Sequence, residues 1–124
     1  MIWNDCKNMQ DELVKIRRDL HKIPEAGLIL PKTRAYVIAA LEEMGIPYVL
    51  SQKDSGIIAT IEGGQPGKTV ALRADMDALP ILEETGVDYA SQHEGFMHAC
   101  GHDCHTACLL TAARILQEHR HELC

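Results

Sequence analysis

The spacing of apolar residues predicts two amphipathic helices in the first part of the chain. Over residues 5–23 the apolar positions recur at steps of three and four, which is the period of one face of an α-helix. This stripe consists of Met9, Leu13, Ile16, Leu20 and Ile23. Pro24 ends the helix, because proline cannot continue the backbone ladder. The same period predicts a second helix over residues 33–44, with Gly45 as its C-terminal cap.

Beyond Gly45, short apolar runs separated by turn residues replace the helical period. These runs predict three strands, at residues 48–51, 56–62 and 69–74. A long irregular stretch over residues 75–101 then leads to a last helix at residues 103–118. Helices, then strands, then a loop-rich segment and another helix indicate an α/β layer fold. Three short strands leave a sheet edge unpaired, so we expect the chain to be part of a larger domain.

Composition supports one folded unit and narrows the choice of partners. The 46% of hydrophobic residues in 124 suits a buried core. The net charge of -6 and the lack of a basic cluster with aromatic residues argue against nucleic acid. No signal peptide is expected at the start, and no apolar run approaches the ~20 residues that span a bilayer, so no membrane partner is expected. Three of the five cysteines crowd into residues 100–108, unlike a disulfide framework, which favours a cytoplasmic protein with reduced thiols.

Potential metal ligands gather in residues 98–105. Cys100 and His102 are two positions apart with Gly101 between them, so a tight loop can direct both side chains at one ion. Thiolate and imidazole are the usual ligands of zinc and neighbouring metals. Asp103 could cap the following helix or hold His102 by a hydrogen bond.

Other interpretations of this segment remain open. Cys104 and Cys108 are one helical turn apart and are expected on the inner face of the last helix, so part of the gathering can be coincidence. A structural zinc site would need a second ligand pair, and upstream the chain offers only His93 at a suitable distance. His21, beside two arginines, is expected to face solvent.

An acidic pair follows the third predicted strand. Asp75 and Asp77 lie two positions apart, so one face of an extended segment can present both carboxylates at the strand's C-terminal tip. Carboxylates there can bind a metal, orient a metal-bound histidine or assist a proton transfer. The alternative is a solvated turn before Pro80.

Three motifs together resemble the N-terminal part of the aminoacylase/carboxypeptidase-like amidohydrolases. This family includes hippurate hydrolases, N-acetyldiaminopimelate deacetylases and indole-acetyl-amino-acid hydrolases. The motifs are RRDLHKIPE at residues 17–25, LRADMDALPI with EETG at residues 72–81 and 83–86, and MHACGHD at residues 97–103. The resemblance covers almost the whole chain, in the family's order and approximate spacing.

The resemblance implies part of an α/β/α sandwich of a zinc-peptidase-like catalytic domain, without its lid domain. It implies a centre of two divalent ions, manganese or zinc, that cleaves the amide bond of N-acyl amino acids or small peptides. Cys100 and His102 would then be metal ligands, and the Asp75/Asp77 pair would hold the catalytic aspartate, with Asp75 as the first choice. Family members are often homo-oligomers.

The family pattern also contains parts that these 124 residues lack. A glutamate pair that supplies the general base, further histidine ligands and the lid are expected after residue 123. We therefore interpret residues 1–124 as an incomplete N-terminal part of the catalytic domain, inactive or nearly so by itself and weak in metal binding. Two alternatives of another class are a small non-catalytic Cys/His module for metal binding or interaction, and a redox-sensing thiol cluster.

Overall fold

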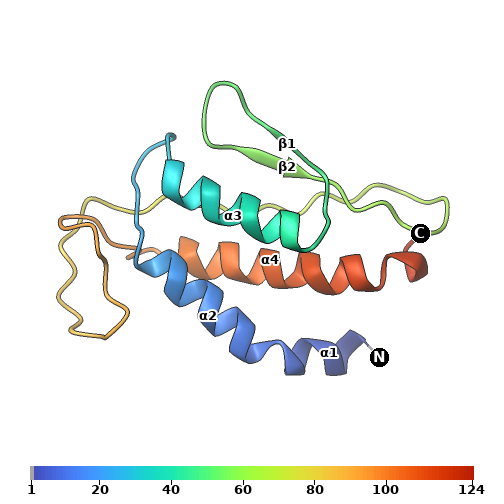
Figure 1. The fold of residues 1–124 in the computed structure, drawn as a ribbon, viewed down its shortest axis with the longest axis horizontal. Helices are drawn as coiled ribbons and strands as arrows, with labels where there is room; N and C mark the ends of the chain where they lie inside the picture. The colour runs from blue at the N-terminus through green and yellow to red at the C-terminus, as the bar shows by residue number, and fades with distance from the viewer. Residues whose placement is uncertain (1) are drawn as a thin grey trace.

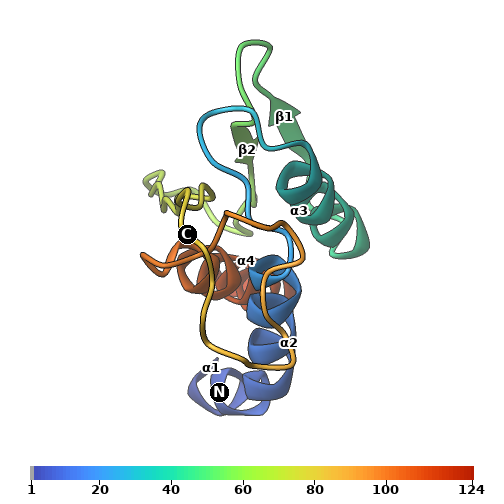
Figure 2. The ribbon, with the colours of Figure 1, turned by 90° about the vertical axis from the view of Figure 1, so that its left-hand side faces the viewer.

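The helices of the chain pack around one central helix. The computed structural model describes residues 2–124. Its elements are α1 (Ile2–Asn8), α2 (Gln10–His21), α3 (Pro31–Glu43), β1 (Tyr48–Leu50), β2 (Ile57–Ala59), α4 (His102–Glu118) and the short 3-10 helix η1 (Arg120–Glu122). Figure 1 shows α4 between α3 on one side and α1 with α2 on the other, and Figure 2 shows the β1–β2 hairpin farthest from α1. Among the described residues, no helix combines the length and apolar character that crossing a bilayer requires.

The first predicted helix is present but divided. Met9 stands between α1 and α2 with φ -88° and ψ 4°, and its N–H bonds the carbonyl of Cys6 over three residues instead of four. The helical ladder then restarts, with the Leu13 N–H donating to the Met9 carbonyl. The helix ends at His21, ahead of Pro24 as predicted.

The second predicted helix is confirmed, and its two ends are capped. α3 begins at Pro31, where proline's missing N–H costs nothing. The Glu25 carboxylate accepts hydrogen bonds from the free N–H groups of Lys32 and Thr33 (3.2 and 2.7 Å). At the other end Gly45 adopts φ 67°, and the Ile46 N–H reaches the carbonyl of Leu41 (3.0 Å), which completes the expected glycine cap.

Two of the three predicted strands form, and the third does not. β1 and β2 pair antiparallel with Tyr48 opposite Ala59. Residues 69–74 form no strand, and within them Val70 and Leu72 are 79% and 60% exposed. The local pattern of this segment suits a strand, but a strand also needs a neighbour to take its backbone hydrogen bonds, and the described residues provide none there.

The core joins α2, α3 and α4. Its buried apolar residues are Ile16, Leu20, Val37, Leu41, Ile46, Ala107 and Leu110. Burying each of the larger aliphatic side chains contributes roughly 1.5–3 kcal/mol, so the core holds α4 firmly against α2. The arrangement confirms the predicted α/β class, as helices with a two-stranded sheet.

One expectation about α4 is wrong. Cys104 and Cys108 are exposed rather than on the inner face. The buried face of α4 passes instead through Asp103, Thr106, Ala107, Leu110, Thr111 and Ile115. Because three of these side chains are polar, a pattern based on apolar residues points to the wrong face.

Candidate metal centre

The irregular stretch over residues 75–101 is tied to the end of α2. The Ala78 N–H donates to the carbonyl of Glu25 (2.7 Å), and the Gln92 N–H donates to that of Lys22 (2.9 Å). Leu79 and Met97 form an isolated antiparallel bridge inside the stretch. Figure 1 shows this stretch at the end of the molecule where α2 ends and α4 begins. Two segments that carry the predicted site residues therefore meet there.

Gly101 turns the chain from the stretch into α4. Its φ of 91° lies in the left-handed region, which costs glycine little and other residues more. His102 is consequently the first residue of α4, and its Nδ1 lies 2.8 Å from the carboxylate of Asp77 in the stretch. The Thr106 hydroxyl donates to the backbone carbonyl of Asp75 (2.9 Å), which fixes the acidic segment beside the first turns of α4.

Asp75, His102 and His105 form a group that we call the Asp75 cluster. The group offers three ligand atoms that all lie within 4.8 Å of one another. Nε2 of His102 lies 3.4 Å from Oδ2 of Asp75, and Nδ1 of His105 donates to Oδ1 of the same carboxylate (2.7 Å). The two imidazole rings stack with their centroids 5.5 Å apart.

Asp77 sets the orientation of His102. The Nδ1–H of His102 donates to the carboxylate of Asp77 (2.8 Å) and to its backbone carbonyl (2.9 Å). A proton on Nδ1 leaves Nε2 of the neutral ring with its lone pair, on the side of Asp75. A carboxylate behind a histidine is the usual support of a metal-binding imidazole.

The dimensions and chemistry of the Asp75 cluster fit a divalent ion. Two ligand atoms about 2.0–2.2 Å from one tetrahedral zinc ion lie about 3.4 Å apart. Nε2 of His102 and Oδ2 of Asp75 have this separation. The hydrogen bond from His105 contributes most to holding the pKa of Asp75 below its ordinary value, so this carboxylate is ionised at neutral pH. Imidazole nitrogen and carboxylate oxygen suit zinc and manganese alike.

The structure brings together three of the four residues selected from the sequence. Asp75, Asp77 and His102 meet, whereas Cys100 is exposed and is not in the Asp75 cluster, so its role as a ligand stays a prediction. His105 is an addition: it lies three positions after His102, on the same side of α4, which is a spacing that the sequence could have revealed. His93 donates to the carbonyl of Pro24 (2.9 Å) and lies outside the cluster.

A second group of ionisable residues lies buried behind the site, and we call it the His21 network. Nδ1 of His21 bonds Asp103 (2.7 Å) and Nε2 bonds Glu83 (3.0 Å), while Nε of Arg17 lies 3.0 Å from the Asp103 carboxylate. The expectation that His21 faces solvent is therefore wrong, and Asp103 holds His21 and Arg17 instead of His102. These contacts join residues up to 82 positions apart, so no local pattern could indicate them.

Glu83 and His98 complete the electrostatics behind the site. Burial by itself would raise the pKa of Glu83, but hydrogen bonds from Thr85 and the Ser91 N–H, with the contact to His21, lower it below its ordinary value. His98 is 5% exposed, and neither ring nitrogen has a hydrogen-bond partner among the described residues. Its burial lowers its pKa, so His98 is neutral at pH 7.

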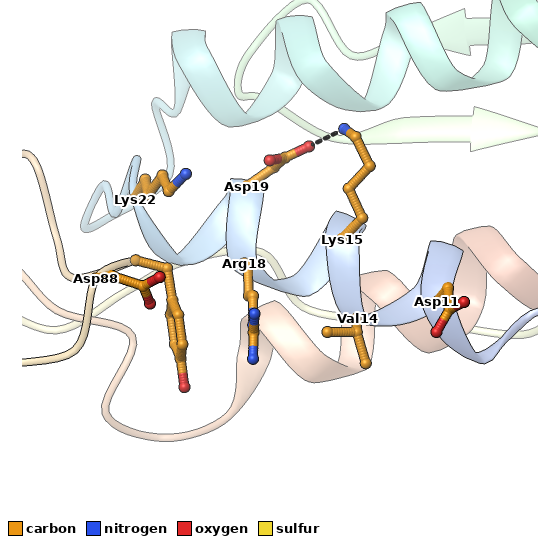
Figure 3. A pocket seen from close by; sticks show the side chains of 8 residues that line it. Asp11, Val14, Lys15, Arg18, Asp19, Lys22 and Asp88 are labelled. Carbon is orange, nitrogen blue, oxygen red and sulfur yellow. Dashed lines mark hydrogen bonds and ion pairs between the residues drawn. The ribbon is translucent and has the colours of Figure 1, made fainter.

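A shallow groove on another part of the surface is formed by residues outside the Asp75 cluster. It runs along α2 and is lined by Asp11, Val14, Lys15, Arg18, Asp19, Lys22, Asp88 and Tyr89. Figure 3 shows its charged side chains and the ion pair between Lys15 and Asp19 (2.6 Å). The Arg18 guanidinium lies 4.5 Å from the centre of the Tyr89 ring. The groove contains no member of the Asp75 cluster, and its three acidic and three basic side chains balance in charge.

Comparisons with known proteins agree with this geometry. Residues 71–123, which include the whole Asp75 cluster, match the model of peptidase family M20/M25/M40. The chain is 47% identical over 119 residues to the N-acetyl-L-cysteine deacetylase of Bacillus subtilis, covering 96% of this chain and 29% of the relative. It is 49% identical over 105 residues to the N-acetyldiaminopimelate deacetylase of Bacillus cytotoxicus, covering 82% of this chain and 28% of the relative.

A solved structure shares the fold. The YXEP protein of Bacillus subtilis, described as a dinuclear metal binding peptidase from the M20 family, superposes with a TM-score of 0.89. The two sequences are 42% identical, and the match covers 94% of this chain and 33% of the other. The chain thus has the fold of one part of these proteins, and it spans less than a third of the length of the two deacetylases.

Proposed function

Since this chain belongs to peptidase family M20/M25/M40, we propose that it carries part of the metal centre of an amidohydrolase that cleaves the amide bond of N-acyl amino acids. The observation that carries the proposal is the Asp75 cluster with Asp77 behind His102, inside the matched residues. The whole of residues 1–124 would then be the N-terminal part of the catalytic domain.

The proposed roles of the site residues follow from their positions. Asp75, His102 and His105 would hold a divalent ion, with zinc or manganese as the candidates, and Cys100 would supply a further ligand from the loop before α4. Asp77 would keep His102 in the tautomer that presents Nε2. Divalent ions in such a centre act as Lewis acids on the amide carbonyl and lower the pKa of water.

The substrate class and setting are proposals of the same kind. Both deacetylases have names that specify an N-acetylated amino acid, which supports N-acyl amino acids as substrates here. All five cysteines are free thiols, which supports a cytoplasmic location. We also propose that the complete enzyme is a homo-oligomer that binds two ions.

Metal analysis tests the assignment of the ligands. The purified chain is dialysed to equilibrium against Zn²⁺, and the zinc bound above the free concentration is measured by mass spectrometry for the wild type, His102→Ala, His105→Ala and Cys100→Ala. His121→Ala is a matched control, because the His121 side chain is 75% exposed. We expect zinc in the wild type and the control, and a loss in the other three variants. Equal zinc in all five proteins would contradict the proposed site.

A further inference from the structure

The His21 network is a set of buried side chains joined by hydrogen bonds and an ion pair. Its side chains are almost fully buried at three positions, with 3% of His21, 4% of Glu83 and 0% of Asp103 exposed. Arg17, 29% exposed, completes the set. Asp103 also accepts the backbone N–H of Cys104 (2.9 Å), and Glu83 accepts that of Ser91 (2.9 Å). Both carboxylates therefore hold backbone as well as side chains.

The hydrogen bonds place the His21 ring between two carboxylates. Nδ1 lies 2.7 Å from Oδ2 of Asp103, and Nε2 lies 3.0 Å from Oε1 of Glu83. Arg17 adds a guanidinium beside the Asp103 carboxylate. Buried polar groups require partners, and the His21 ring is the partner that Asp103 and Glu83 share.

The position of the His21 network places it directly behind the metal centre. Asp103 is the next residue after His102 and lies in the first turn of α4. Glu83 lies in the same irregular stretch as Asp75 and Asp77. His21 is the last residue of α2. One imidazole thus joins the helix that carries His102 to the stretch that carries both aspartates.

We propose that His21 is a positioning residue for the metal centre, which by bridging Asp103 and Glu83 holds His102 against Asp77 and so presents Nε2 to the ion. This inference rests on the proposed function for the identity of the ligands. Without His21, the carboxylates of Asp103 and Glu83 would lose their shared partner, and α4 would be held to the acidic stretch by fewer contacts, such as the hydrogen bond from Thr106 to Asp75.

The experiment combines metal affinity with a direct view of the rings. Zn²⁺ binding is measured by calorimetry, and the ring nitrogens are observed by NMR in metal-free protein labelled with ¹⁵N-histidine. The variants are His21→Gln, Glu83→Gln and the double variant, with His121→Ala as control. Each signal is assigned by its loss in a variant of that histidine, and circular dichroism confirms that each protein folds.

We expect His102 in the wild type to show a proton on Nδ1 alone. In His21→Gln, His102 should become a mixture of tautomers and Zn²⁺ should bind about 10–100-fold more weakly, as is typical when the support of a metal ligand is lost. Glu83→Gln should give a smaller change in the same direction. If His21 and Glu83 act as one unit, the double variant should lose no more than His21→Gln alone.

The outcomes separate this inference from the proposed function. A folded His21→Gln protein with the wild-type His102 signal and affinity would overturn the role of His21. If His21→Gln fails to fold, an unchanged His102 signal in Glu83→Gln would overturn it instead. A wild type that binds no Zn²⁺ would contradict the proposed function, while the His102 signal in metal-free protein still decides whether His21 positions the ring.

Discussion

The Asp75 cluster and the His21 network contain the same kinds of side chain but differ in access to solvent. In the His21 network the imidazole and both carboxylates are at most 4% exposed. In the Asp75 cluster the side chains of Asp75, His102 and His105 are 22%, 18% and 57% exposed. Histidine and carboxylate side chains therefore connect buried segments in the His21 network, whereas in the Asp75 cluster they offer ligand atoms that solvent can reach.

The difference between the two groups lies in how their hydrogen bonds are satisfied. Both ring nitrogens of His21 contact a buried carboxylate of the network, so neither nitrogen remains to bind an external partner. His102 uses only Nδ1 for Asp77 and keeps Nε2 directed at Asp75. Changes in the network should thus lower the stability of the fold and reach metal binding only through the position of His102, whereas changes in the cluster should act on metal binding directly.

The largest effect is expected from Asp103→Asn. It leaves His21 and Arg17 without the carboxylate that they share, and breaking a buried ion pair costs about 3–5 kcal/mol. Urea denaturation should show this loss in the free energy of unfolding. Asp88→Asn, at an exposed position, is the control and should change it by no more than about 0.5 kcal/mol. A loss of similar size in both variants would contradict the special role of the network.

Addition of metal should stabilise the protein through the Asp75 cluster and Cys100. An ion that binds the folded state stabilises it by about 2.7 kcal/mol at a free concentration of 100 times Kd. Zn²⁺ should therefore raise the melting temperature of the wild type, and a chelator should reverse the change. In His105→Ala the increase should shrink while the metal-free melting temperature stays close to that of the wild type, because His105 is exposed. An undiminished increase would exclude His105 as a ligand.

Asp77→Asn should separate an effect on metal binding from an effect on folding more sharply than His105→Ala does. The Asp77 side chain is 43% exposed, so the metal-free protein should keep its stability within about 0.5 kcal/mol. The asparagine amide supports the His102 ring less well than a carboxylate, so Zn²⁺ affinity should fall about 10-fold or more in calorimetry. If stability falls and Zn²⁺ affinity does not, then Asp77 supports the fold, as the His21 network does, and not the metal site.

The two groups also differ in how far the sequence could predict them. The helices and the Gly45 cap follow from local spacing, and so does the His102–His105 pair on α4. The contacts of His21 depend on how α2, the irregular stretch and α4 pack, so the local pattern of two arginines and a histidine predicted solvent instead. The failed strand at residues 69–74 has the same physical origin, since a strand depends on a neighbour that its own residues do not specify.

The smallest effect is expected far from both groups, where His119 links the ends of the described chain. Its Nε2 contacts Asp5 in α1 (2.9 Å) and its Nδ1 contacts Glu122 (2.7 Å); the hydrogen bond to Glu122, followed by that to Asp5, raises the pKa of His119 above its ordinary 6.5. A raised pKa in the folded state gives stability that is fully present below pH 6.5 and disappears as the pH rises through the folded value. The melting temperature of the wild type should therefore fall slightly between about pH 6 and 8 relative to that of His119→Gln. His121→Gln, on an exposed neighbour, should follow the wild type, and parallel curves for wild type and His119→Gln would show that this link does not stabilise the fold.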